Sequence, residues 1–488
     1  MTARPGSHAA GDALGARAFW PASGAPDLCS RTAVDLAGLL ARGEVSAGEV
    51  LETHLDWIDR RNPELNAICT LDRDHAFEQA RAADDLRRRD PEAAAAKPLF
   101  GLPTAVKDLV PTKDIRTTFG SPIFADNVPD FDALIVDRIR DAGAVVIGKT
   151  NTPEFGAGSQ TFNPVFGKTR NPWDPARTCG GSSGGAAAAL ASRMLPIADG
   201  SDLGGSLRNP ASFCGVVGFR PTPGRVPRVP PEQGWDDLAV LGPMGRNVAD
   251  AALFFSVIAG PDPRDPISLG RPSRPFHPVE PLDLRELRLA WTPNLGRYPV
   301  EREVVEVCEA ALPVFRDLGA EVEEAAPDLS GAGNIFRTLR ANLFADKLGP
   351  LFPGHRDQMK DTVIEEIERG LALTGPDIAT AQAERTRLHC RVVEFFEHYD
   401  ALLLPTVQVL PFDVDQPYPA EIEGQPMTSY TDWMASCYSI TVTGCPAISV
   451  PGGVGPSGLP VGLQIVTSRG SDRITLGIAA AFEAGTPE

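Results

Sequence analysis

The sequence predicts an α/β fold with a largely buried sheet. Along its 488 residues, short apolar runs typical of strands alternate with segments whose apolar residues recur at helical spacing. The hydrophobic fraction of 42% and the charged fraction of 23% are ordinary for a packed globular protein. Length alone favours two or three domains. Because no repeat and no clear linker divides the chain, we expect one large domain over residues 29–488.

The N-terminal part is predicted to be a tail followed by three helices. Gly, Ala, Ser and Pro dominate residues 1–28, which we expect to be flexible. Thr32 is expected to cap the first helix. Ser46 with Glu49 forms a capping box at the start of the second helix, which should end near Asn62-Pro63. A third, amphipathic helix is expected over about 73–89.

Further along, strands and helices are predicted in alternation. The expected strands are 102–107, 144–147, 287–291, 401–404, 446–450 and 461–466. The expected helices are 133–141, 186–191, 247–259, 301–318, 357–370 and 376–398. The block 167–222 is unusually rich in Gly, Ser and Pro, and the alanine helix lies inside it.

Charge and composition exclude several classes of function. The 46 basic and 64 acidic side chains give a net charge of −18, which disfavours nucleic acid as a partner. No apolar run is long enough to cross a membrane, and no signal peptide is evident. The eight cysteines lack C-x-x-C spacing and the seven histidines are scattered, so we expect a cytoplasmic protein with no metal and no cofactor.

One motif matches a nucleotide-binding loop in its letters only. Residues 143–150, GAVVIGKT, satisfy the P-loop pattern G-x-x-x-x-G-K-[ST]. A phosphate cradle needs a tight loop, whereas Ala-Val-Val-Ile favours a strand. A core strand is therefore the preferred interpretation, and nucleotide binding remains a remote alternative.

A second motif matches the nucleophile elbow of α/β-hydrolases. Residues 181–185, GSSGG, fit G-x-S-x-G with Ser183 at the centre. That chemistry needs a histidine later in the chain. The candidates, His355, His389 and His398, lie in charged helical segments, so a histidine triad has weak support.

A third pattern uses both glycine-rich turns that flank the alanine helix. Gly204 and Gly205 precede Ser206, and such glycines let backbone N–H groups converge beside a serine hydroxyl, as an oxyanion requires. Without histidine, the available base is a lysine that burial has discharged. Lys107, at the end of an apolar strand, fits that description, although Asp108 beside it also allows an ordinary ion pair.

These features together resemble the amidase signature family, the serine hydrolases with a Ser-cisSer-Lys triad. The resemblance extends over nearly the whole chain from about residue 30. Its motifs are GLPTAVKD at 101–108, TNTPEF at 150–155, the block 171–222, LGPM at 241–244, GCPAISVP at 444–451 and GLPVGLQ at 458–464. The resemblance implies one domain with a mixed, twisted sheet of many strands surrounded by helices.

The resemblance also implies a role for each site residue. Ser206 matches the acyl-accepting serine, Ser182 the serine after a cis peptide bond, and Lys107 the base that takes a proton relayed through Ser182. The implied oxyanion hole is the backbone N–H groups of Leu203, Gly204, Gly205 and Ser206. The residues implied to orient this loop are Ser183, Ser201, Asp202 and Arg208.

The substrate is predicted only as a class. Gly156, Ala157 and Gly158 leave room near the nucleophile, and Phe336 with Leu339, Leu343, Phe352 and Met359 suggests an apolar funnel, though core packing is expected for most of them. We expect a linear aliphatic or aryl amide, with carbamates and esters accessible to the same chemistry and a homo-oligomer left open. The glutaminase component of a glutamine-dependent aminoacyl-tRNA amidotransferase, its A-type chain, is the alternative, against which SDL at 201–203 and RPTPG at 220–224 argue.

Overall fold

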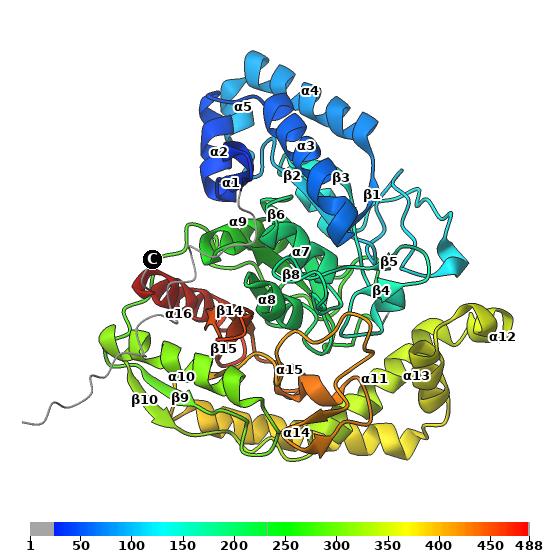
Figure 1. The fold of residues 1–488 in the computed structure, drawn as a ribbon, viewed down its shortest axis with the longest axis vertical. Helices are drawn as coiled ribbons and strands as arrows, with labels where there is room; N and C mark the ends of the chain where they lie inside the picture. Colours follow the sequence, from blue (N-terminus) through cyan, green and yellow to red (C-terminus); the bar gives the residue numbers. More distant parts are fainter. Residues whose placement is uncertain (1–23, 232, 487–488) are drawn as a thin grey trace, which may run out of the picture.

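An eight-stranded mixed sheet forms the centre of the molecule (Figure 1). The structure, a computed structural model, describes residues 24–231 and 233–486. The strand order is β10-β9-β11-β15-β14-β7-β8-β6, with parallel pairing of β9 to β10 and β11 and antiparallel pairing elsewhere. The strands are β6 (Ile197–Asp202), β7 (Val217–Arg220), β8 (Val240–Gly245), β9 (Arg288–Trp291), β10 (Glu321–Glu324), β11 (Ala401–Pro405), β14 (Ala447–Val454) and β15 (Pro460–Val466).

A smaller sheet stands against one edge of the large one. It consists of β1 (Ile68–Leu71), β3 (Val145–Thr150) and β2 (Pro103–Lys107), with β3 in the middle and parallel to β2. Side-chain bonds connect its edge strand β2 to the edge strand β6, because Thr104 Oγ1 donates to Ile197 O at 3.2 Å. Two short hairpins complete the strands, β4 (Phe162–Asn163) with β5 (Gly167–Lys168) and β12 (Glu421–Ile422) with β13 (Gln425–Pro426).

Helices surround both sheets (Figure 1). The N-terminal group is α1 (Asp27–Ser30), α2 (Ala33–Arg42), α3 (Ala47–Leu65), α4 (Arg73–Arg89) and α5 (Pro91–Ala95). The helices packed on or beside the central sheet are α6 (Leu134–Asp141), α7 (Gly184–Ala191), α8 (Arg208–Cys214), α9 (Val248–Ile258), α10 (Arg302–Asp317), α15 (Ala435–Thr441) and α16 (Asp472–Gly485). A third group, α11 (Ala332–Leu348), α12 (Phe352–His355), α13 (Asp361–Leu371) and α14 (Gly375–Phe396), lies at the opposite end of the molecule from α2–α5.

The predicted α/β class with a mixed sheet is confirmed, and most predicted elements form within a few residues of their expected bounds. Thr32 caps α2 and Ser46 with Glu49 makes the capping box of α3. Helix α3 was predicted to end near Asn62-Pro63, and it ends two residues later, at Leu65, with Pro63 inside it. The Asn62 side chain accepts hydrogen bonds from Ala67 N and Ile68 N and donates one to Ile68 O. These bonds hold the backbone just beyond the helix end.

The predicted tail lies mostly outside the described residues. Its first 23 residues are not described, and its last two belong to α1, which begins at Asp27. Of the described helices, none is long and apolar enough to cross a lipid bilayer.

Candidate active site

Lys107 is the last residue of β2, and its amine is fully buried. In the small sheet it pairs with Thr150 of β3, and its side chain is 0% exposed. The amine nitrogen Nζ lies 2.7 Å from Ser182 Oγ, 2.8 Å from Ser183 Oγ and 2.9 Å from Ser201 Oγ. Strand β2 therefore delivers one buried amine to three hydroxyls from two other segments.

Burial also changes the charge that this amine carries. Removal from water lowers the pKa of Lys107 to about 7, although the carboxylates of Asp199 and Asp202 act in the opposite direction. A substantial fraction of the amine is therefore unprotonated at neutral pH. An unprotonated amine is the form that can accept a proton.

The first serine turn, which contains Ser182 and Ser183, leads directly into the alanine helix α7. The peptide bond between Gly181 and Ser182 is cis. Ser183 N–H donates to Ser206 O at 3.2 Å, so the first turn is bonded to the second. The Ser183 side chain is fully buried, with its hydroxyl 2.8 Å from Lys107 and 3.3 Å from the backbone oxygen of Ser201.

The second serine turn, which runs from Asp202 through Ser206 to Arg208, is stabilised by buried ion pairs of Asp202. Arg208 donates from Nε to Asp202 Oδ2 and from Nη2 to Asp202 Oδ1, both at 3.0 Å, and both side chains are fully buried. Burial by itself raises the pKa of Asp202, but Arg208 and Arg220 outweigh it and hold that pKa well below its usual range. Asp202 is therefore a fixed anion at the start of the turn.

The turn between Asp202 and Arg208 contains Ser206 and the four predicted oxyanion donors. Gly205 has φ of +126°, and a Cβ on Gly204 would meet Phe336 Cζ at 2.7 Å. The Gly205 N–H donates to Asp202 Oδ1 at 2.8 Å, so it is already engaged. In the described part of the chain, no acceptor is bonded to the N–H groups of Leu203, Gly204 and Ser206. Three of the four predicted oxyanion donors are therefore unoccupied.

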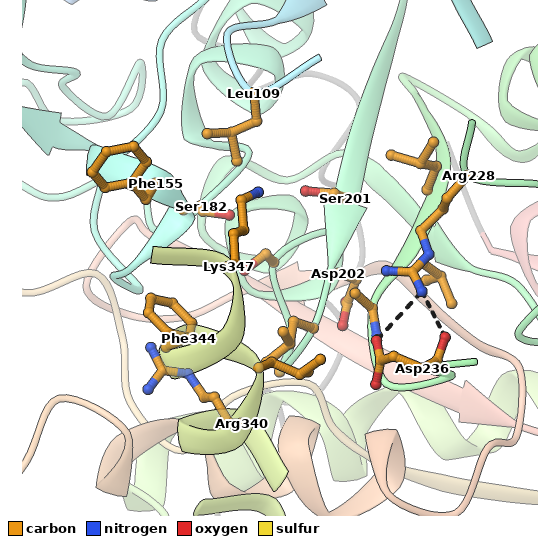
Figure 2. Close-up of a pocket in the computed structure, with 18 of the residues that line it drawn as sticks. Leu109, Phe155, Ser182, Ser201, Asp202, Arg228, Asp236, Arg340, Phe344 and Lys347 are labelled. Atoms are coloured by element: carbon orange, nitrogen blue, oxygen red, sulfur yellow. Dashed lines mark hydrogen bonds and ion pairs between the residues drawn. The ribbon is translucent and has the colours of Figure 1, made fainter. Parts of the chain in front are cut away.

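A cavity of about 290 Å³ opens over the two serine turns (Figure 2). Ser182, Ser201 and Ser206 lie on its wall. Much of the remaining wall is apolar, and its larger apolar members include Leu109, Phe119, Phe155, Phe336, Leu343, Phe344, Leu348 and Met434. A substrate in this cavity would contact Ser206 while an apolar group fills the rest.

Comparison with known proteins identifies the family. The family model described as Amidase matches residues 49–476. The chain belongs to the amidase family. Both the resemblance to the amidase signature family and the prediction of an amide-hydrolysing enzyme are thereby confirmed.

Two similar proteins of the amidase family differ in the activities that their names give. The chain is 37% identical to an acylamidase of Rhodococcus erythropolis over 93% of its own length and 95% of the relative's. It is also 37% identical to the A-type chain of the glutamyl-tRNA(Gln) amidotransferase of Thermus thermophilus, over 93% and 96% of the two chains. Sequence identity alone therefore does not separate the two activities.

Solved structures of amidase-family enzymes share the whole fold. A bacterial aryl acylamidase of the amidase signature family superimposes with a TM-score of 0.88 at 29% identity, covering 94% of this chain and 96% of that one. The 6-aminohexanoate cyclic dimer hydrolase gives 0.86 at 30% identity, covering 95% and 98%.

The pocket residues predicted for this amidase-family chain are partly placed on the cavity. Gly156, Gly158 and Phe336 line it. Ala157 does not: it is fully buried, in the apolar cluster that also contains the wall residues Phe155 and Phe344. Of the other funnel residues, Leu343 lines the cavity, whereas Leu339, Phe352 and Met359 pack elsewhere.

Several cavity residues were not predicted from the sequence. Arg340, Phe344 and Lys347 follow Phe336 on α11 at spacings of four, eight and eleven residues, so they share one helix face. Figure 2 shows Lys347 extending from α11 into the cavity. This spacing is the signal that could have identified them, but a helix at 332–348 was itself not predicted.

The P-loop alternative is not supported by the structure. Residues 145–150 form β3, and Lys149 is fully buried, with Nζ 2.6 Å from Val110 O and 2.7 Å from Thr112 Oγ1. A phosphate therefore has no access to the Lys149 amine. The histidine triad also fails, because no histidine is among the described residues that line the cavity.

A metal centre has no evident set of ligands in the described residues. No group of three or more His, Cys, Asp or Glu side chains is arranged to hold an ion there. All eight cysteines are free thiols. The arrangement that remains is a buried amine, a pair of serine turns and unoccupied backbone donors.

Proposed function

We propose that this enzyme hydrolyses linear amides with apolar acyl or aryl groups through an acyl-enzyme on Ser206. The observation that carries the proposal is the contact of 2.7 Å between the buried Lys107 amine and Ser182 Oγ, at the wall of a cavity that also contains Ser206. A serine becomes a nucleophile when an adjacent base removes its proton.

In the proposed reaction, Ser206 Oγ attacks the substrate carbonyl carbon as its proton passes to Ser182 and the Ser182 proton passes to neutral Lys107. The relay requires Ser206 Oγ to turn toward Ser182, since no hydrogen bond joins the two hydroxyls among the described residues. Contacts of this kind often tighten only when substrate binds.

The negative charge that develops on the carbonyl oxygen needs donors already in place. The N–H groups of Leu203, Gly204 and Ser206 are available for it, whereas that of Gly205 is bonded to Asp202. Loss of one such donor costs typically about 10²–10³-fold in turnover. Lys107 then returns the proton through Ser182 to the departing amine, and a water molecule hydrolyses the ester on Ser206 by the reverse relay.

The substrate class follows from the cavity wall. Its aromatic and aliphatic side chains favour an apolar acyl or aryl group. The names of two similar proteins, an acylamidase and an aryl acylamidase, support the same class. Carbamates and esters contain the same electrophilic carbonyl and are included in the proposal as further substrates.

The glutaminase alternative needs charges on the wall that bind the α-amino and α-carboxylate groups of free glutamine. Two guanidinium groups of the wall already have carboxylate partners, Arg228 with Asp236 at 3.4 Å and Arg340 with Glu366 at 2.6 Å, whereas Asp346 and Lys347 also line the cavity. Figure 2 shows the first of these pairs across the cavity from Lys347. Ammonia release from glutamine, measured with and without the other amidotransferase chains, would revive the alternative if it exceeded release from simple amides.

The remaining expectations are also proposals. We propose a single domain from residue 29 to 488, a cytoplasmic location, small-molecule amides or carbamates as the partners, and a homo-oligomer as a state to be measured. The anionic surface, with a net charge of −18, supports the expectation that nucleic acid is not a partner.

The decisive experiment is mass detection of the acyl group left on Ser206 after exposure to a panel of amides, esters and carbamates. We expect Ser206→Ala and Lys107→Ala each to lower turnover by at least about 10³-fold at pH 7 with the fold retained. Lys168→Ala is the matched control, because Lys168 is partly exposed and pairs with Asp415 far along the chain. Near-normal turnover by either site variant would refute the role given to that residue.

A further inference from the structure

A second buried acid touches Lys107 at its backbone. Asp199 lies on β6 and is 1% exposed. Its Oδ1 accepts a hydrogen bond from the Lys107 backbone N–H at 2.9 Å, and its Oδ2 has no partner among the described residues. A buried carboxylate oxygen without a partner costs free energy, so packing alone does not account for it.

Asp199 and Ser201 hold the same lysine at two points. Successive side chains of a strand alternate, so residues 199 and 201 lie on one face of β6. From that face, Asp199 bonds the Lys107 backbone and Ser201 Oγ bonds the Lys107 amine at 2.9 Å. Strand β6, at the edge of the large sheet, thereby fixes the position of the Lys107 amine at the end of β2.

Asp199 also has no arginine partner among the described residues. The other nearby acid on β6, Asp202, forms ion pairs with Arg208 and Arg220. Asp108 bonds to Thr118 through both oxygens, and Lys149 bonds to Val110 O and Thr112 Oγ1.

The titratable groups facing this region come from six elements and the adjoining loops. They are Cys69 on β1, Lys107 on β2, Asp108 and Asp132 in loops, Lys149 on β3, Asp199 and Asp202 on β6, Arg208 on α8 and Arg220 on β7. Burial raises the pKa of Asp199, while the Lys107 N–H and the charges of Lys149 and Lys107 lower it.

We propose that Asp199 is a positioning residue for Lys107, which fixes the strand end that carries the amine and, by its negative charge, strengthens that amine as a base. The inference rests on the proposed function, in which Lys107 accepts the proton. Without the charge of Asp199, the buried amine loses the electrostatic support that opposes desolvation, and it becomes a weaker base.

The test is the isosteric variant Asp199→Asn, with kcat and KM measured from pH 5 to 10. Asparagine keeps an acceptor for the Lys107 N–H but removes the charge. We expect the acid limb of kcat/KM, near pH 7 in the wild type, to move to lower pH by about one unit. The plateau of kcat should fall several-fold, because a weaker base accepts the proton less readily, while KM stays within about twofold.

Asp250→Asn is the matched control, because Asp250 on α9 is also fully buried but accepts from Val34 N of α2 and from Asn247 Nδ2 at the start of α9. It should leave the limb in place. An unmoved limb in folded Asp199→Asn overturns the inference. A wild type without an acid limb, or an active Lys107→Ala, overturns the proposed function instead.

A measurement on the wild type covers the case in which Asp199→Asn does not fold. The carboxyl carbon of Asp199, followed by carbon-13 NMR, should titrate below the pH at which the Lys107 Cε signal titrates. A carboxyl group that is still protonated when Lys107 loses its proton would contribute no charge and would overturn the inference.

Discussion

The hydrogen bonds of Lys107 constrain the proton arrangement of the site. A charged lysine amine has three N–H donors, whereas a neutral one has two donors and one lone pair. Its three partners are the hydroxyls of Ser182, Ser183 and Ser201, and no carboxylate pairs with the amine among the described residues. In the neutral state one hydroxyl must donate to the amine. In our proposal that hydroxyl is Ser182, which frees its own oxygen to receive the proton of Ser206.

The glycine before the nucleophile gives a sharp prediction at the same scale. Gly205 has φ of +126°, and an added Cβ would lie 2.6 Å from Asn209 Oδ1 and 2.6 Å from Cys437 Cβ. We expect Gly205→Ala to displace Ser206 and its N–H and to lower kcat by at least about 10²-fold. Gly458→Ala is the control, since Gly458 has φ of +75° with nothing within 4 Å of an added Cβ.

That control should lose about 1 kcal/mol of unfolding free energy, from backbone strain alone, and keep its turnover. Steady-state kinetics and urea unfolding of both variants separate the two effects. Equal turnover losses in the two variants would show that strain, and not displacement of the nucleophile, is responsible.

At the scale of elements, the sequence predicted the outer frame better than the centre. Helices α2, α4, α10 and α14 were predicted because each has an apolar stripe at helical spacing. Strands β6 and β7 were missed. Gly200 and Ser201 give β6 no apolar or β-branched run, and its pairing with β8 is a long-range contact that local pattern does not encode.

The site was predicted by motif, and the rest of its surroundings was not. Lys107, Ser182 and Ser206 lie in sequence motifs that resemble those of the family. Asp199, by contrast, is an acidic residue inside a strand that was not predicted. On α11, Phe336 and Leu343 were predicted for the pocket, but Arg340, Phe344 and Lys347 were missed, because this helix face mixes apolar and charged side chains. Such a mixture is typical of a helix on the protein surface, but these residues line the cavity.

The ion pair between β6 and α8 gives a prediction at this scale. Arg208 is fully buried and bonds Asp202, Cys437 O, Gln464 Oε1 and Thr441 Oγ1, so one side chain connects several elements. Removing one partner of a buried pair typically costs about 3–5 kcal/mol. We therefore expect Arg208→Met to lower the unfolding free energy by about that amount and to lower turnover.

Arg302→Met is the control for that experiment, since Arg302 pairs with Glu306 at 2.6 Å while 85% exposed. Exposed pairs contribute at most about 1 kcal/mol. Denaturant unfolding gives both values. A loss below about 1 kcal/mol for Arg208→Met would mean that the buried ion pairs are not what holds the nucleophile turn.

For the molecule as a whole, the buried base should make stability depend on pH. Burial lowers the pKa of Lys107 to about 7, and those of Lys149 and Lys360 to about 8, from 10.5. Between these values and 10.5 the unfolded chain binds more protons than the folded one, so the unfolding free energy rises with pH across that window. The destabilisation by each lysine is complete below its folded pKa and absent above about 10.5.

Lys107→Met removes one of these contributions and tests the claim directly. Urea unfolding at pH 7, 8, 9 and 10 should show the wild type gaining stability relative to the variant, by on the order of 4 kcal/mol over this range. The loss of three hydroxyl contacts shifts the difference equally at every pH, so its slope is the informative quantity. Lys168→Met, at a partly exposed position, should give a flat difference. A flat difference for Lys107→Met as well would mean that the amine stays charged in the folded protein, and the proposed base would then lack the free electron pair on which the reaction depends.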